Sequence, residues 1–251
     1  MALRAGVLII GSLLWDEANA RPQWRAQRLD EKNAKPASVP IRYGRFSTKR
    51  GGYAMVFSNL CYRHRELGLG VIVPFVRPIT TFDGLRQEAE FLASAEGLGN
   101  SWEWGAVGLL RNKSSEFPVD LVEEWRRFFT GKTRHYQAFV GHTPSEAPSI
   151  DRDGFLNLKW PISGNDSAKY DFLLATPTKA RIQDHSNLKR YPRPREIGAL
   201  LRSDATNYFI SNVLHGIRTS EDASIWRTVT RLYPQFAAEW PQIGSSLSPR
   251  I

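Results

Sequence analysis

Two short stretches of this sequence carry residues whose types and positions could do chemistry, and the first is a loop near the N-terminus. Gly11 and Ser12 follow the β-branched apolar run at residues 7–10 and precede Leu13 and Leu14. Glycine lets the backbone approach a ligand closely, so successive N–H groups here could surround a carboxylate or phosphate oxygen. A Gly-Ser pair after a strand is also an ordinary turn, and the residues alone leave both interpretations open.

The second stretch ends at Glu96, a carboxylate that a helical period places among apolar side chains. At about 100° per residue, Glu96 falls on the same line as Leu85 and Leu92. An unpaired buried carboxylate is costly, so Glu96 on this face needs a partner or takes part in catalysis as a general acid or base. The alternative is a glutamate on a frayed last turn that curls into solvent, and periodicity favours neither interpretation.

Both candidates stand at the ends of predicted elements. The apolar run at residues 7–10 predicts a buried strand, and the loop follows it directly. Thr80, three residues before Asp83, approximates a capping box, and the helical period then continues from Phe82 to Glu96 before a glycine. The sequence therefore predicts that a strand end and a helix end carry the site.

The rest of the chain predicts further strands and helices without an internal repeat. Residues 38–45 and 53–57 have strand character on either side of Gly51 and Gly52, which predicts a hairpin. In the next strand, Pro74 indicates an edge strand or a strand end. Further strands are predicted at residues 71–73, 104–110, 135–141 and 170–176, a turn at residues 153–154, and helices at residues 118–131, 194–201, 203–214 and 220–233.

The positive charge of the chain raises the question of nucleic-acid binding. Lys and Arg outnumber Asp and Glu by 34 to 25. The basic residues are scattered, with no basic helix, finger or aromatic RNA-binding signature beside them. We therefore expect no specific nucleic-acid partner. A basic nucleic-acid-associated protein remains an interpretation beside those given below. A pocket for a small anion explains the charge as well, because cations steer carboxylates toward it.

Cysteine, histidine and hydropathy patterns narrow the class of protein. Cys61 is the single cysteine, which excludes an internal disulfide and favours the cytoplasm. No apolar run reaches the roughly 20 residues of a membrane helix, so we expect no membrane partner. None of the 5 histidines pairs at the helical spacing of a zinc site, and no phosphate-binding glycine motif occurs. We therefore expect no metal and no nucleotide cofactor.

The loop resembles a motif of a known enzyme family. Residues 10–14 are similar to the YGSxL loop of the γ-glutamylcyclotransferases, although Ile10 stands where the family has its tyrosine. The continuation through Leu14, Trp15 and Asp16 is similar to the bacterial glutathione-degrading branch, in which the loop commonly runs on into an aliphatic residue, a Trp and an acid.

The end of the predicted helix resembles the same family. Its catalytic glutamate stands in a helix end where a Leu and an Asp precede a Glu-Gly pair. In this chain Leu92, Glu96 and Gly97 keep the Leu and the Glu-Gly pair, and an alanine stands in place of the acid. The resemblance covers residues 7–110, and the second half of the chain matches no motif.

The resemblance implies a fold. It is mixed α/β (α+β): a γ-glutamylcyclotransferase-like curved mixed sheet or partial barrel with packed helices and a helical C-terminal extension. Residues 1–130 would form the core, and residues 131–251 would add strands and a helical region packed on it. Apart from the resemblance, the predicted helices from about Pro194 onward match no motif, and we expect them to cap the pocket or offer a partner surface, with plain core as the alternative.

The resemblance also implies an activity, the cyclisation of a γ-glutamyl amide to 5-oxoproline with release of an amine or peptide. Glu96 would act as the general acid and base, without a cofactor. A homodimer stays open. Because Ile10 replaces the tyrosine, a non-catalytic module that binds a small anion on the same fold is the alternative. The residues that would bind the substrate are Ile10, Gly11, Ser12, Leu13 and Leu14.

Overall fold

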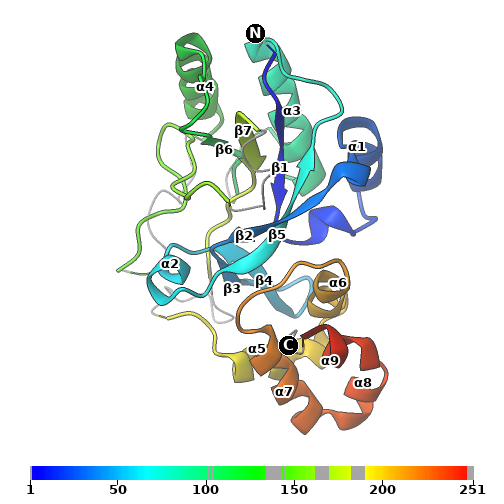
Figure 1. The fold of residues 1–251 in the computed structure, drawn as a ribbon. Helices are drawn as coiled ribbons and strands as arrows, with labels where there is room; N and C mark the ends of the chain where they lie inside the picture. Colours follow the sequence, from blue (N-terminus) through cyan, green and yellow to red (C-terminus); the bar gives the residue numbers. More distant parts are fainter. Residues whose placement is uncertain are drawn as a thin grey trace.

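The computed structural model describes residues 2–100, 102, 105–133, 143, 145–161, 170–181 and 190–247. In this part of the chain a five-stranded sheet and a two-stranded sheet are accompanied by helices (Figure 1). The predicted α+β class is confirmed, and the described strands do not close into a barrel.

The larger sheet has the strand order β2-β5-β1-β7-β6. In its middle β1 (Ala5–Ile9) runs antiparallel to β5 (Gly68–Pro74) and parallel to β7 (Phe172–Ala175). Its edges are β2 (Lys35–Val39) and β6 (Gly108–Arg111). All five residues of β1 are buried, and this explains why the strand is continuously non-polar instead of alternating.

The smaller sheet is the predicted hairpin, formed by β3 (Ile41–Ser47) and β4 (Gly52–Phe57). The single strand predicted at residues 38–45 is wrong, because β2 ends before Pro40 and β3 begins after it, in a different sheet. Proline has no N–H group with which to continue a ladder, so the chain changes sheets at this residue.

Helix α3 (Phe82–Glu96) has the bounds that the sequence predicts. Its N-cap is Thr81, whose hydroxyl accepts a hydrogen bond from the N–H of Gly84 at 3.2 Å, one residue later than the predicted Thr80. Gly97 follows in the left-handed conformation with φ of 75°, which glycine adopts without strain and which ends the helix. The cap and the glycine together fix where Glu96 lies.

Other helices differ in part from their predictions. The helix predicted at residues 203–214 begins only at Tyr208, because Asn207 has a left-handed φ of 49°. The helices that cover the larger sheet or connect its strands are α1 (Arg21–Arg28), α2 (Leu60–His64) and α4 (Val119–Lys132). Those that gather beside β3 and β4 at one end of the molecule are α5 (Pro194–Leu200), α6 (Tyr208–Leu214), α7 (Asp222–Leu232), α8 (Pro234–Ala238) and α9 (Pro241–Leu247) (Figure 1).

The larger sheet unites the two halves of the chain. Strand β7, from the second half, lies between β1 and β6, so the sheet continues across residue 130. Strand β5 lies inside the sheet, and Pro74 marks its end. The strand predicted at residues 135–141 lies outside the described residues, as does the beginning of the one predicted at residues 104–110.

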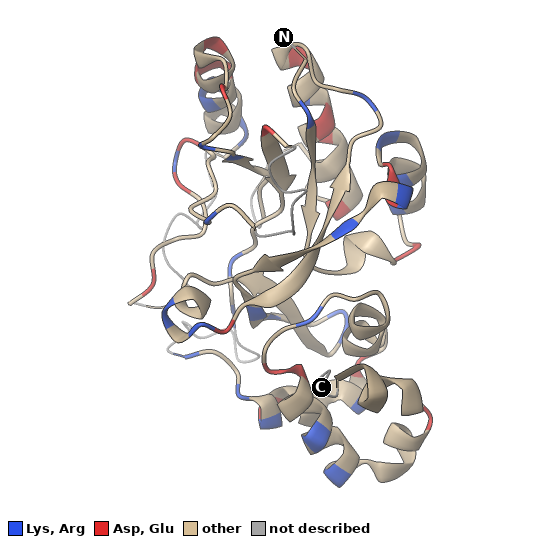
Figure 2. Cartoon of the chain, in the orientation of Figure 1, with Lys and Arg blue, Asp and Glu red and all other residues tan. Residues whose placement is uncertain are grey.

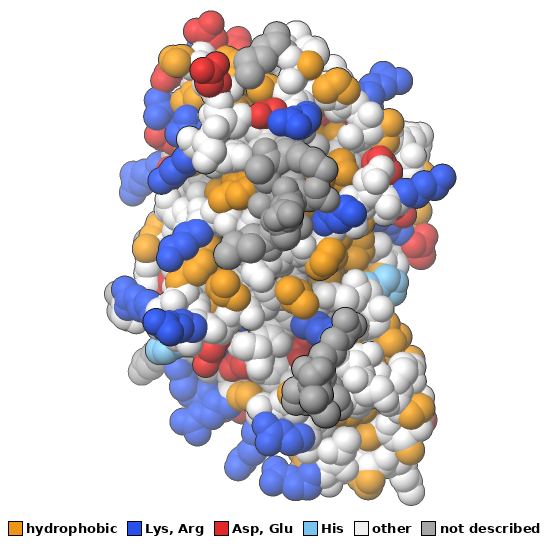
Figure 3. All heavy atoms as spheres, viewed as in Figure 1, with side chains coloured by type: hydrophobic (Ala, Val, Ile, Leu, Met, Phe, Trp, Pro, Cys, Tyr) orange, Lys and Arg blue, Asp and Glu red, His pale blue; other side chains and the backbone are white. Residues whose placement is uncertain are grey.

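Charged side chains are spread over the molecule. Figure 2 shows Lys and Arg on helices, strands and connections at both ends. On the face in Figure 3 they stand in separate places, with the largest group at the lower end. None of the described helices combines the length and the apolar composition that crossing a membrane requires.

Candidate functional site

The first loop leaves the end of β1 as one short turn of 3₁₀ helix, η1 (Ser12–Leu14). The N–H of Leu14 donates to the carbonyl of Gly11 at 3.2 Å, and the N–H of Asp16 donates to the carbonyl of Ser12 at 2.8 Å. The first donors of such a turn have no acceptor within it, so the N–H groups of Ser12 and Leu13 are available for a ligand. This geometry suits the oxygen-binding role predicted for the loop.

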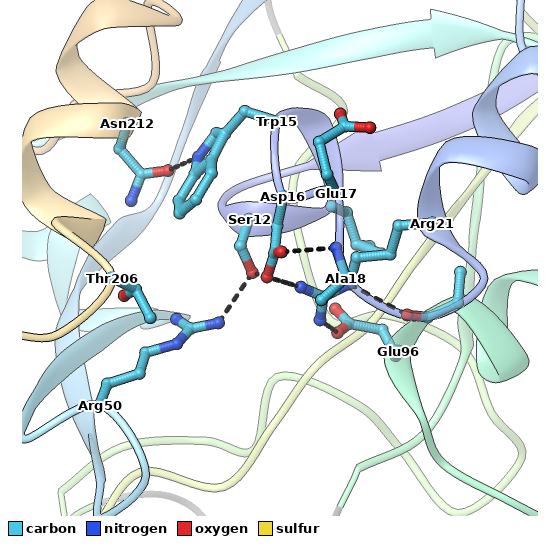
Figure 4. A network of polar contacts seen from close by, with 12 residues as sticks. Ser12, Trp15, Asp16, Glu17, Ala18, Arg21, Arg50, Glu96, Thr206 and Asn212 are labelled. Atoms are coloured by element: carbon cyan, nitrogen blue, oxygen red, sulfur yellow. Dashed lines mark hydrogen bonds and ion pairs between the residues drawn. The ribbon is translucent and has the colours of Figure 1, made fainter.

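Glu96 is the last residue of α3, and its side chain keeps 18% of its exposure. Leu85 and Leu92 are fully buried, so the predicted apolar face is confirmed. One carboxylate oxygen accepts a hydrogen bond from the hydroxyl of Thr176 at 2.9 Å. The other lies 3.3 Å from a guanidinium nitrogen of Arg21 (Figure 4). Glu96 therefore has a partner and does not turn into solvent alone.

Arg21 joins the loop to the end of α3. It is the first residue of α1, is 7% exposed, and donates through Nε to the carbonyl of Ala95 at 3.1 Å. Its Nη1 donates to Ser12 Oγ at 3.3 Å and pairs with the carboxylate of Asp16, while Nη2 faces Glu96 (Figure 4). A planar guanidinium with five donors can hold all these groups in one arrangement.

A cavity of about 470 Å³ lies between the loop, the end of α3 and the β3–β4 hairpin. Its size is that of a small-molecule site. Ile10, Gly11, Ser12, Leu13 and Glu96 line it, so the structure brings five of the six predicted site residues together. The sixth, Leu14, does not line the cavity and packs against the hydrophobic core instead.

Polar residues that sequence reasoning missed complete the wall of the cavity. Apart from Asp16, which belongs to the motif that continues the loop, each comes from outside the two predicted motifs, and no local spacing marks it. The charged ones are Asp16, Arg21, Arg45, Lys49 and Arg50, and the hydroxyl-bearing ones include Ser47, Thr176, Thr178, Thr206 and Tyr208. With Glu96, the described lining holds four cationic side chains against two carboxylates, a balance that suits a ligand with a negative group.

Helix α6, from the C-terminal part of the chain, contacts the first loop. The indole Nε1 of Trp15 donates to Oδ1 of Asn212 at 2.8 Å, and the ring of Tyr208 lies beside that of Trp15. Burial raises the pKa of the Tyr208 hydroxyl, so it stays protonated at neutral pH. Tyr208 and Thr206 also line the cavity, which is consistent with the expected contribution of the chain after Pro194 to the pocket.

A glycine is needed at position 11 because a side chain has no room there, and not because of its backbone angles. Its φ of −177° is extended and open to any residue. A Cβ atom at this position, however, would lie 2.3 Å from the hydroxyl oxygen of Tyr208, and the next nearest atom, Cζ of the same ring, is 3.3 Å away. A side chain at Gly11 therefore pushes against α6.

We expect Gly11→Ala to lower the free energy of unfolding by about 1–3 kcal/mol, since a methyl group is forced into an occupied position. In a Tyr208→Phe background the clashing oxygen is gone, so the same change should cost less than half as much. Chemical denaturation of both single variants and the double variant measures this coupling. Gly131→Ala, where no atom lies within 4 Å of the new Cβ, is the control and should cost nothing. Additive losses would contradict the proposed clash.

Two neighbouring glutamates on α3 lie differently from Glu96. Glu88 is 3% exposed and forms a two-armed ion pair with Arg28. Glu90 is partly exposed and lies 3.3 Å from the amine of Lys132. Neither residue lines the cavity that contains Glu96.

The described part of the chain contains no group of three or more His, Cys, Asp or Glu side chains that could hold a metal ion. Of the histidines only His64 and His215 belong to this part, and His215 stacks on Trp15. Cys61 is buried, which raises the pKa of its thiol to about 12 and makes it a poor nucleophile.

Comparisons of the chain with models of protein families, with curated proteins and with solved structures find no match. The resemblance of the loop and the helix end to the γ-glutamylcyclotransferases therefore depends on those residues alone.

Proposed function

We propose that the chain is a γ-glutamylcyclotransferase-like enzyme that converts a γ-glutamyl amide to 5-oxoproline and a free amine or peptide. The observation that carries the proposal is that Glu96 and the first loop border one cavity and are joined by Arg21. A base and a binding loop at one cavity are the two parts that an intramolecular cyclisation needs. The expected compartment is the cytoplasm, where a single unpaired cysteine such as Cys61 is usual.

In the proposed reaction Glu96 passes two protons, one after the other, from the attacking nitrogen to the leaving nitrogen. The α-ammonium group of the substrate gives a proton to the Glu96 carboxylate, and the freed amine attacks the γ-carbonyl carbon of the same molecule. As the bond from that carbon to the leaving nitrogen breaks, Glu96 gives this proton to that nitrogen. The carboxylate then takes the second proton that the attacking nitrogen loses and passes it to the released amine. Both reactants belong to one molecule, so holding it in the folded conformation supplies much of the rate.

The contacts of Glu96 suit this role because they leave acceptor positions open. Thr176 and Arg21 each contact one oxygen of the carboxylate, and a carboxylate offers about four lone-pair positions. The two contacts fix the direction of the group, and the remaining positions can accept the substrate ammonium. Ser12 and Leu13 would meanwhile bind the substrate's α-carboxylate through their N–H groups.

The alternative is a module that binds a small anion without catalysis. The observation that favours it is the ion pair of Glu96 with the buried Arg21, because a carboxylate can be retained for such a pair alone. Under this alternative the cavity still binds its ligand, and Glu96 serves the structure of the wall.

The experiment that tests the proposal is a search for 5-oxoproline after incubation of the purified protein with γ-glutamyl dipeptides, γ-glutamylamines and glutathione, without added metal or nucleotide. We expect release from at least one of these compounds. No product from any of them, together with measurable binding of one, would favour the binding module.

A further inference from the structure

Arg50 is a cation of the cavity wall whose backbone is held on both sides. It belongs to the turn between β3 and β4, where its N–H donates to the carbonyl of Ser47 at 3.2 Å. Its own carbonyl accepts from the N–H of Ala205 at 3.1 Å. The side chain thus starts from a fixed position at the edge of the cavity.

The guanidinium group of Arg50 is fixed as well. One nitrogen donates to Ser12 Oγ at 2.9 Å (Figure 4), and the group lies 4.5 Å from the centre of the Tyr208 ring. Stacking and one hydrogen bond leave most of its five N–H donors unused. They belong to a group that is already oriented beside the predicted binding loop.

Arg50 also differs from the arginines of α1 in having no carboxylate partner among the described residues. Arg21, Arg25 and Arg28 each pair with at least one Asp or Glu, whereas no ion pair of Arg50 occurs in that part of the chain. A partly buried cation without a counter-charge is unfavourable, so binding an anion beside it releases part of that cost. Arg50 is therefore a cation of the cavity wall that can take a carboxylate from a ligand.

We propose that Arg50 binds a carboxylate group of the ligand in this cavity, beside the loop at Ser12. Its planar fork matches the two oxygens of a carboxylate. Arg21 joins Glu96 to the same Ser12. An α-amino acid head group would therefore place its carboxylate on Arg50 and its ammonium near Glu96, which takes the proton in the proposed reaction. The identity of the ligand as a γ-glutamyl compound or 5-oxoproline rests on the proposed function.

A calorimetric binding experiment tests this role without depending on turnover. The probes are 5-oxoproline, its analogue 2-pyrrolidinone, which lacks the carboxylate, and L-glutamate. We expect the wild-type protein to bind 5-oxoproline, L-glutamate or both. If it binds 5-oxoproline, it should bind 2-pyrrolidinone at least 10-fold more weakly. Arg50→Gln should weaken carboxylate binding by about 10–100-fold, the range for a hydrogen bond to a charged group.

Two further variants separate a direct contact from other effects. Arg50→Lys keeps the charge but not the fork and should bind with intermediate affinity. Arg63→Gln removes the same charge from an exposed position of α2 outside the cavity and should change nothing. Thermal unfolding of each variant checks the fold, and if Arg50→Gln does not fold, Arg50→Lys and the comparison of 5-oxoproline with 2-pyrrolidinone decide.

The outcomes distinguish this inference from the proposed function. Turnover with unchanged carboxylate affinity in Arg50→Gln would overturn the role of Arg50 and leave the enzyme standing. Arg50-dependent carboxylate binding without any turnover would support Arg50 and reject the enzyme. Binding of neither carboxylate, or Arg50-dependent binding of inorganic phosphate in their place, would overturn the inference.

Discussion

Glu96→Gln is expected to lower the rate of 5-oxoproline release by roughly two to four decades, the usual contribution of a general acid or base. Glutamine keeps the size of the side chain and can still accept the hydrogen bond from Thr176, but it cannot take up the substrate's proton. Arg21 keeps Asp16 as a partner, so the wall of the cavity should persist. Substrate binding should therefore change by no more than a few-fold, and initial rates over a range of substrate concentrations measure both quantities.

The matched control is Glu90→Gln, which makes the same chemical change on the same helix. Glu90 is partly exposed, pairs only with Lys132 in the described part of the chain and lies outside the cavity. Its replacement should leave the rate within a few-fold of wild type. Glu88→Gln does not serve as a control, because Glu88 is buried against Arg28 and its loss would destabilise the fold. Near-normal turnover in Glu96→Gln would remove Glu96 from the role of base.

The second large effect is expected for Arg21→Gln, which should reduce the free energy of unfolding by about 3 kcal/mol. The guanidinium is almost fully buried, and its removal leaves the carboxylates of Asp16 and Glu96 without their common partner. It also removes the hydrogen bond to Ser12 Oγ that ties the loop to α3. Denaturation with urea measures the loss, and turnover should fall as well because Glu96 is no longer held.

An exposed arginine pair gives the comparison for this variant. Arg126 lies 2.6 Å from Glu123 and 3.1 Å from Asp153, and these side chains are 40%, 54% and 52% exposed, so Arg126→Gln should cost less than about 1 kcal/mol. In addition, combining Arg21→Gln with Glu96→Gln should cost less than the sum of the two single changes, since the two side chains interact. Equal losses for Arg21→Gln and Arg126→Gln would show that Arg21 does not organise the site.

The sequence predicted those parts of the site that follow from local pattern. The apolar run before Gly11 is a buried strand, and α3 ends where the helical period and Gly97 place its end. These two element ends put the loop and Glu96 at one cavity, as the resemblance implied. Strand ends and helix caps are local properties, so a single sequence can specify them.

The partners of these residues could not be predicted because they come from long-range contacts. Arg21 and Glu96 are 75 residues apart in the chain, and Ser12 and Arg50 are 38 apart. Nothing in the local sequence distinguishes Arg21 or Arg50 from the other scattered cations. The position of Tyr208 was also not predictable, because it begins a helix whose start the sequence placed five residues too early.

Helical periodicity also failed to separate the glutamates of α3. The Glu88 side chain is less exposed than that of Glu96, because it forms a salt bridge with Arg28. A charge can be buried when its partner comes with it, and the partner lies 60 residues away in sequence. Periodicity records where apolar residues stand and contains no information about such pairs.

The most direct test of the central claim is mass spectrometry of the products formed from a γ-glutamyl amide whose α-nitrogen carries ¹⁵N, in water enriched in ¹⁸O. Intramolecular cyclisation places the ¹⁵N in the ring of 5-oxoproline, takes no oxygen from water and releases an unlabelled amine. The account predicts this product from the wild-type protein and its near absence with Glu96→Gln. Glutamate carrying ¹⁸O would reveal a hydrolase instead, and equal 5-oxoproline from both proteins would contradict the role of Glu96.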